Sequence, residues 1–501
     1  MIRFLFLLHR YLGIGVGLVM LLWTLSGVVM MYKQYPELSD RQKLQLLQPL
    51  QLEGCCVVPL ALAQATATFD DASIEMLNSK PVLRLQARRG DSNVFDLTTG
   101  MPFGEWNEQQ ARLLAKDFVE RRTHSETPTL IGTVHNDQWT VYGGYNRYRP
   151  LYKYALNDAI GTQFYISSQT GEIVQLTTRE QRVWGYLGAV VHWLYPTLLR
   201  ENTALWAQVV IWLSIIGIFL TVTGIYIGLR QFKQRRNGRR SPYRGWAFFH
   251  HIAGLVFGVL TLTWVASGLL SMNPWGALEG EGIADERARL TERPLTAQDV
   301  TSVLAVLPIA SLAADSVRID VGVMAGKATV ISYQQSGERQ RLDATTLRAS
   351  DLSEQQLQNL ALRLQPQSVI AEAGMLQIAD QYYYEHHEPR EFPVYRVVFD
   401  DDQRRHYYLS AVSGEIVYKI DGNTRWYRWL FNGFHRGDFS AWLRSRPLWD
   451  TLMLLFLVGV CVVTGTGTYL AVKRVNRDIR RMISQVGKRE WERDEVKNLE
   501  I

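Results

Sequence analysis

The sequence predicts a membrane protein with a core of four spanning α-helices, built as two parallel repeats of helix, external α+β domain and helix. Three observations support this fold class: long apolar blocks, basic residues gathered beside them, and a pattern that occurs twice in the chain. The apolar blocks cover residues 11–31, 205–229, 252–272 and 448–472. Each is long enough to cross a bilayer as a helix, which takes about 20 residues.

The repeated pattern begins with the first and third apolar blocks. Residues 7–31 and 248–272 align at a spacing of 241 residues, which pairs His9 with His250 and Trp23 with Trp264. A second alignment starts at Asp137 and Asp380, at a spacing of 243 residues, and runs without a gap to the end of the next apolar block. The sequence therefore predicts that a unit of helix, external domain and helix occurs twice in the chain.

Two spans in each unit give both copies the same orientation in the membrane. The second alignment pairs His192 with His435, each just before the second span of its unit. We therefore expect His9 and His250 at one depth and His192 and His435 at one depth near the opposite face.

The net charge of +6 is unevenly distributed. Residues 230–244 carry seven basic side chains and no acid, residues 473–489 are also basic, and Arg3 and Arg10 flank the first span. Because these runs adjoin spans, the positive-inside rule explains them better than nucleic-acid binding does. The expected location is a bacterial inner membrane, with both termini and the 230–247 loop in the cytoplasm and the first block kept as an uncleaved anchor.

The expected organisation follows in chain order. It comprises span 1 (1–34), external domain 1 (35–183), an interfacial helix and span 2 (184–229), a basic loop (230–247), span 3 (248–272), external domain 2 (273–426), an interfacial helix and span 4 (427–472), and a cytoplasmic tail (473–501).

Turn signals and alternating patterns predict an α+β structure in both external segments. The expected helices are 58–69, 109–122, 297–307 and 353–364, and the expected strands lie within 82–97, 138–174, 316–344 and 375–418.

The four paired histidines predict a cofactor site at each membrane face. Haem iron takes two axial ligands, imidazole is a common one, and histidines within membrane helices are usually functional. The alternative is that these histidines only anchor helix ends at the interface. The matched positions favour two non-covalent b-type haems, one held by His9 and His250 and the other by His192 and His435.

His251 and Arg10 form a second tier of candidates. A histidine one position along a helix points about 100° away, so only one of His250 and His251 can face His9. We choose His250 because it aligns with His9, and we expect Arg10 and His251 to contact a propionate or to anchor a helix end.

Several short motifs follow one another along the chain. They are the LHRYLG opening with its later Trp and Ser-Gly, the segments FYISSQTGEIV and YYLSAVSGEIV, the histidine after each, and the TGxY ending of the following span. In these motifs and their order the chain resembles the PepSY-associated transmembrane proteins, over almost its whole length. The resemblance implies PepSY-like modules outside the membrane and an inner-membrane reductase of ferric siderophores, with histidine-ligated b-type haems that pass electrons outward.

The expected activity is a haem-dependent ferric (siderophore) reductase. It would accept electrons from a quinol or a separate cytoplasmic reductase, because no dinucleotide fingerprint, Walker loop or nucleophile elbow occurs. The expected partners are membrane lipid and a ferric chelate, and no nucleic acid. A transporter and a membrane-anchored PepSY binding or sensing module are the rival hypotheses.

Two further groups stay without an assigned role. His386 and His387 suggest a metal or substrate contact, although loop histidines are commonly just solvated. Cys55 and Cys56 could form a reactive pair, but adjacent cysteines bridge rarely, and Cys461 is expected to be a packing residue.

Overall fold

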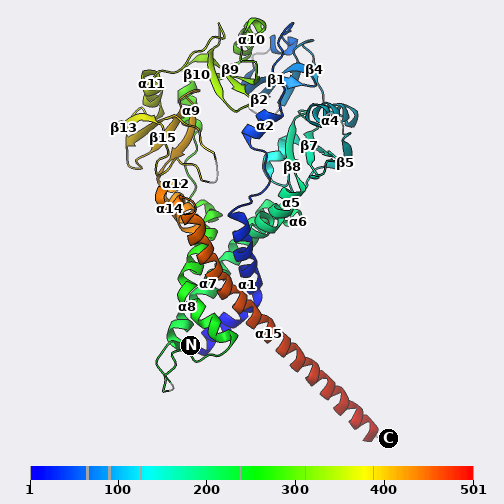
Figure 1. Ribbon diagram of the computed structural model, residues 1–501, viewed down its shortest axis with the longest axis vertical. Coiled ribbons are helices and arrows are strands. Elements are labelled where there is room, and N and C mark those ends of the chain that lie inside the picture. The colour runs from blue at the N-terminus through cyan, green and yellow to red at the C-terminus, as the bar shows by residue number, and fades with distance from the viewer. Residues whose placement is uncertain are drawn as a thin grey trace. The chain divides into compact units, whose positions relative to one another are not determined.

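The computed structural model describes residues 2–63, 67–87, 92–123, 127–236, 238–310, 312–386 and 389–499. It divides into two compact units (Figure 1). The helical unit comprises Met1–Tyr35, Trp184–Leu278 and Trp426–Ile501, and the sheet unit comprises Pro36–Val183 and Glu279–Arg425.

In the described part of the chain, four helices are long and apolar enough to cross a membrane. They are α1 (Ile2–Met30), α7 (Thr203–Gln231), α8 (Trp246–Ser271) and the first part of α15 (Leu448–Leu499), up to Gln485. Helix α1 packs against α7 and α15, and α8 packs against the same two neighbours, so the four helices form a closed bundle. Figure 1 shows α15 continuing as one helix towards the C-terminus.

Short elements lead into α7 and α15. Before α7 lie α5 (Arg179–Gly185), a π-helical turn η2 (Tyr186–Val190) and α6 (Thr197–Arg200). Before α15 lie α12 (Gly422–Tyr427), a π-helical turn η5 (Arg428–Gly433), α13 (Phe434–Arg436) and α14 (Ala441–Arg444). Each π turn ends two residues before a predicted histidine ligand. Such turns are rare and occur often at functional sites.

The sheet unit holds one sheet that both external segments build together. It has eight strands in the order β12-β11-β10-β1-β2-β3-β4, with β9 paired to β1. The strands are β1 (Thr68–Leu77), β2 (Lys80–Ala87), β3 (Ser92–Asp96), β4 (Pro102–Phe103), β9 (Leu295–Thr296), β10 (Ser316–Met324), β11 (Lys327–Gln334) and β12 (Arg339–Asp343). The antiparallel pairing of β1 with β10 joins the two segments.

Two four-stranded antiparallel sheets complete this unit, one from each segment. The first contains β5 (Thr129–Val134), β6 (Leu151–Ala155), β7 (Gln163–Ser167) and β8 (Ile173–Thr177). The second contains β13 (Val369–Leu376), β14 (Val394–Asp400), β15 (His406–Ser410) and β16 (Ile416–Ile420). Helix α4 (Glu108–Thr123) packs its apolar side on the first, and α11 (Glu354–Leu364) packs on the second. The remaining elements are α2 (Asp40–Leu46), α3 (Leu60–Ala63), η1 (Gly143–Tyr148), η3 (Pro274–Gly276), α9 (Ala284–Thr291), α10 (Ala297–Val306) and η4 (Leu307–Ile309).

Helices α4, α10 and α11 match three of the four helices predicted in the external segments. The helix predicted over 58–69 is wrong, because among its described residues only the four of α3 are helical and β1 begins at Thr68. Thr68 and Phe69 pair with β9, and Phe69 also pairs with β2, which outweighs local helical preference there. The strand regions predicted over 138–174 and 375–418 are broken, the first by η1 and the second between β13 and β14.

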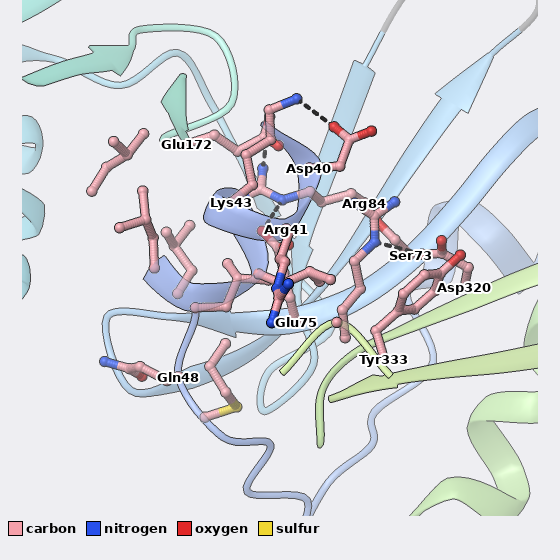
Figure 2. A pocket seen from close by; sticks show the side chains of 18 of the residues that line it. Asp40, Arg41, Lys43, Gln48, Ser73, Glu75, Arg84, Glu172, Asp320 and Tyr333 are labelled. Carbon is pink, nitrogen blue, oxygen red and sulfur yellow. Dashed lines mark hydrogen bonds and ion pairs between the residues drawn. The ribbon is translucent and has the colours of Figure 1, made fainter. Parts of the chain in front are cut away.

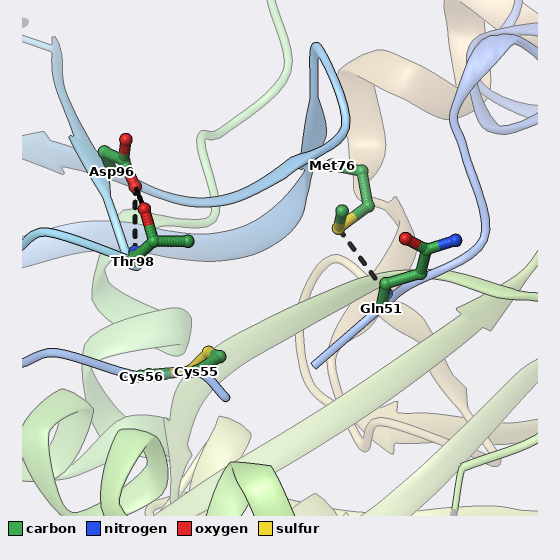
Figure 3. Close-up of a disulfide and its surroundings, with 6 residues drawn as sticks. All are labelled: Gln51, Cys55, Cys56, Met76, Asp96 and Thr98. Atoms are coloured by element: carbon green, nitrogen blue, oxygen red, sulfur yellow. Dashed lines mark hydrogen bonds between the residues drawn. A yellow bond between two sulfur atoms is a disulfide. The ribbon is translucent and has the colours of Figure 1, made fainter. Parts of the chain in front are cut away.

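Cys55 and Cys56 are joined in a disulfide, contrary to the expectation that adjacent cysteines would stay apart (Figure 3). The Cys55 side chain is buried in the apolar core of the eight-stranded sheet. The next residue, Val57, donates its backbone N–H to the carbonyl of Leu97 at the end of β3. The cysteine pair thus belongs to a segment that packs against the eight-stranded sheet.

Candidate site: two histidine pairs in the helical unit

The structure brings His9 and His250 together. His9 lies near the start of α1 and His250 near the start of α8, and their ring centroids are 6.2 Å apart. The ring planes are tilted by 37°. Two helices that begin far apart in the sequence therefore present one imidazole each to the same point.

We call His9 and His250 the inner pair. Each of their rings is held by a backbone carbonyl of a third or fourth helix. Nδ1 of His9 lies 3.0 Å from the carbonyl oxygen of Leu220 in α7. Nδ1 of His250 lies 3.1 Å from the carbonyl oxygen of Val463 in α15. A carbonyl oxygen can only accept a hydrogen bond, so Nδ1 must carry the proton, and Nε2 keeps its lone pair free for a metal.

His192 and His435 form an outer pair built on the same plan. Their ring centroids are 6.1 Å apart and their planes are inclined at 64°. Nδ1 of His192 donates to the carbonyl of Trp23 at 3.0 Å, and Nδ1 of His435 donates to the carbonyl of Trp264 at 3.2 Å. Again each ring leaves its Nε2 available.

A hydroxyl group accompanies every one of these hydrogen bonds. Thr223 and Thr466 place Oγ1 at 3.4 and 3.2 Å from Nδ1 of the inner histidines. Ser26 and Ser267 place Oγ at 3.2 and 3.1 Å from Nδ1 of the outer histidines. The inner pair thus has two threonines and the outer pair two serines. Hydrogen bonds to Nδ1, in both pairs, fix the orientation of the ring and raise the basicity of the nitrogen that would bind a metal.

The spacing of both pairs fits two imidazoles on opposite sides of one metal ion. A bond between a metal and an imidazole nitrogen is about 2 Å long, which places two such ring centroids about 6 Å apart. No group of three or more His, Cys, Asp or Glu side chains in the described ranges is arranged to hold a metal ion. Two axial nitrogens alone suit an ion whose other positions are filled by a planar macrocycle, as in haem.

Glycines let the rings lie against neighbouring helices. A Cβ added at Gly224 would lie 2.7 Å from Cε1 of His9, and one added at Gly467 would lie 3.0 Å from Cε1 of His250. Both distances are shorter than ordinary contact. The TGxY ending of each span therefore supplies both the threonine and the glycine that the inner rings require.

One contact breaks the similarity of the two outer ligands. The ring of Phe431 stacks on the ring of His435, with centroids 5.2 Å apart and planes 26° apart. The residue at the equivalent place before His192 is Gly188, which has no ring to stack. Sequence reasoning missed Phe431, although the mismatch in an otherwise matched pair of segments was visible.

His251 is hydrogen-bonded near the start of α8 and belongs to neither histidine pair. Its side chain is buried, its Nδ1 lies 2.8 Å from Oγ of Ser241, and its Nε2 lies 2.9 Å from the carbonyl oxygen of Gly228. Both ring nitrogens are therefore occupied, which excludes His251 as an iron ligand in this conformation. Arg10 is exposed.

His386 belongs to the sheet unit, whereas the four paired histidines belong to the helical unit. His387 lies outside the described residues.

A bundle of four apolar helices, joined to a separate unit of antiparallel sheets and helices, defines a multi-span membrane protein that carries α+β domains. The chain belongs to the PepSY-associated TM region family, whose sequence model matches residues 6–474. It is accordingly a membrane-embedded protein. No curated protein matches the chain.

Proposed function

We propose that this protein is a transmembrane dihaem oxidoreductase of the inner membrane, with cytoplasmic termini and the sheet unit in the periplasm. The observation that carries the proposal is the pair of facing imidazoles at each of two sites, 6.2 and 6.1 Å apart, with every Nδ1 hydrogen-bonded to a backbone carbonyl. Histidines that merely anchored helix ends would have no reason to face each other at this spacing.

We further propose that the chain is two parallel repeats. The hydrogen bond from His9 to Leu220 recurs from His250 to Val463, and the spacing of the donors and of the acceptors follows the two sequence alignments. The contact from His192 to Trp23 recurs in the same way from His435 to Trp264. Repetition of entire contact sets supports a duplicated scaffold with one ligand of each pair from each copy.

When bound, the two b-type haems would carry single electrons from a quinol or a separate cytoplasmic reductase to a periplasmic Fe(III) chelate, such as a ferric siderophore, and reduce it to Fe(II). The chain's own residues hold the macrocycles in place. His9 and His250 would supply both axial nitrogens of the inner one, and His192 and His435 those of the outer one. The backbone carbonyls keep each ring in the Nδ1–H tautomer.

The four single changes His9→Ala, His250→Ala, His192→Ala and His435→Ala test this assignment. Either of the first two should remove only the inner haem, and either of the last two only the outer haem, as read from haem content and reduced-minus-oxidised spectra. Reduction of a ferric hydroxamate, followed with a Fe(II)-specific dye, should fail in all four. His251→Ala is the matched control, because it changes a neighbouring histidine whose nitrogens are already occupied. Retention of both haems in all four variants would overturn the assignment.

A further inference from the structure

A charged cavity in the sheet unit has no role in the function proposed above. It has a volume of about 970 Å³ and lies over the eight-stranded sheet, under α2 and the turn between β7 and β8 (Figure 2). The volume falls within the range of small-molecule sites, about 300–1,000 Å³. All of its lining belongs to the sheet unit, so it is separate from the histidine pairs.

The cavity lies on the polar face of the sheet. Along β1, Ala72 and Ile74 are fully buried in the apolar core, whereas the alternate residues Ser73 and Glu75 line the cavity. Strands β2 and β10 repeat this alternation, because side chains on a strand point to opposite faces in turn. The resulting face carries Arg84 and Asp320 beside Ser73 and Glu75 (Figure 2). Arg318 also lines the cavity.

The side chain of Arg84 is only 8% exposed. Its Nε donates to Glu75 at 2.5 Å, and its Nη1 donates to the carbonyl of Thr170 at 2.6 Å. Its Nη2 is buried and has no hydrogen-bond partner among the described residues. A buried donor without an acceptor is costly, so an acceptor oxygen from a ligand in the cavity would be favoured there.

Four carboxylates lie around Arg84 and Arg318, namely Glu75, Glu172, Asp71 and Asp320, and the rest of the lining adds basic side chains such as Lys43 and Arg147. Arg318 donates to Asp320 at 2.6 Å, which leaves Asp71 at 3.8 Å from Arg318 and Glu172 at 3.9 Å from Arg84. Both distances are too long for hydrogen bonds.

Burial raises the pKa of Asp320 to about 6, and Asp71 contributes to the rise, in spite of the adjacent arginine. An ammonium group between Asp71 and Glu172 would give both carboxylates a positive charge closer than the guanidinium groups at 3.8 and 3.9 Å.

We propose that this cavity binds a small ligand with an ammonium group next to a carbonyl oxygen, the chemistry of a peptide amino terminus. The carbonyl oxygen accepts from Nη2 of Arg84, and the ammonium group lies among the carboxylates of Asp71 and Glu172. Binding at this site requires no haem, so the binding proposal can be tested independently of the redox proposal.

Isothermal titration of the full-length protein in nanodiscs tests the proposal. The probe is trialanine amide, and its matched control is N-acetyl-trialanine amide, which keeps every carbonyl but lacks the ammonium group. We expect saturable binding of the first and at least about tenfold weaker binding of the second.

Three variants assign the binding to this cavity. Asp71→Asn removes a carboxylate that is 49% exposed, and Arg84→Lys keeps the charge beside Glu75 but removes Nη2. Each should weaken binding by about tenfold or more. Glu108→Gln changes an exposed carboxylate on α4 outside the cavity and should leave binding unchanged. Unaltered thermal unfolding and haem content would show that each variant is folded.

Three results would overturn the proposal. They are no binding of trialanine amide up to about 10 mM, well above the range of specific ligands, equal binding of the acetylated control, and unchanged binding by the folded Asp71→Asn variant. Full displacement of the peptide by an equal concentration of MgCl2 would also overturn it, because the carboxylates would then form a metal-ion site.

Discussion

Gly224→Ala should remove the inner haem while leaving the fold and the outer haem in place. The added Cβ would lie 2.7 Å from Cε1 of His9, and ordinary contact begins at 3.4 Å. The ring must therefore retreat by about 0.7 Å, since Gly224 is inside a helix and its backbone cannot easily yield. Metal–ligand distances tolerate only about 0.2 Å. We expect a loss of haem affinity of at least about 10- to 100-fold, the range seen when contacts that support a ligand are altered.

The same substitution should not unfold the protein. Alanine is favoured over glycine inside a helix by up to about 1 kcal/mol, so helix α7 gains rather than loses intrinsic stability. Gly27→Ala is the matched control, because its added Cβ would lie 3.6 Å from Cε1 of His192, which is ordinary contact. Haem content per protein and low-temperature α-band spectra distinguish the two variants. The reasoning is refuted if Gly224→Ala keeps both haems with unchanged spectra, or if Gly27→Ala loses the outer haem as readily.

Three further predictions concern single side chains. Lys419→Met should lower the free energy of unfolding by about 3–5 kcal/mol, because it leaves Glu286 buried without the ammonium group 2.8 Å away. Thermal unfolding measures this loss of stability, and the added change Glu286→Gln should recover most of it. Burial holds the pKa of His406 at about 4 against its ordinary 6.5. The unfolded chain therefore binds more protons between these values, and this residue makes stability fall as pH drops from about 6.5 to 4. In His406→Gln the loss of stability over this range should be smaller than in the unaltered protein, and an unchanged slope would contradict the burial argument. Ser26→Ala removes a hydroxyl group 3.2 Å from Nδ1 of His192, which lowers the basicity of this ligand. The midpoint potential of the outer haem alone should therefore rise, by less than about 59 mV if the effect on relative affinity is below tenfold. A redox titration in which this potential fell, or in which the inner haem shifted instead, would contradict the prediction.

The pairing of the histidines could be anticipated from the sequence because two stretches of the chain align with two later ones. His9 and His250 share a position in aligned segments, and so do His192 and His435. The structure brings the members of each aligned pair together. What the alignment could not supply was the backbone carbonyl that holds each ring, because that depends on the rotation of each of the four long helices about its axis.

The sheet unit was harder to anticipate. Pairing of β1 with β10 joins residues more than 200 positions apart, such as Ala72 and Val321, and no local signal encodes such a register. The sequence patterns suggested a separate domain in each external segment. The cavity with Arg84 exists only because the two segments share one sheet, so its lining was not visible from either segment alone.

Phe431 and the disulfide between Cys55 and Cys56 are departures from local expectation. The first lies in a stretch where the two copies differ, and its stacking on His435 follows from the π-helical turn that ends at Gly433. The second lies in a segment packed against the core of the eight-stranded sheet. In both places the packing of the chain decides the outcome.

We propose that each histidine pair holds one b-type haem. The ratio of haem to protein tests this, measured by the pyridine haemochrome method in full-length protein purified in detergent from haem-replete cells. We expect two b-type haems per chain, with spectra typical of iron ligated by two histidines. If the protein bound no haem under full supply, the proposal would be wrong, and the four facing histidines would be structural contacts of the bundle.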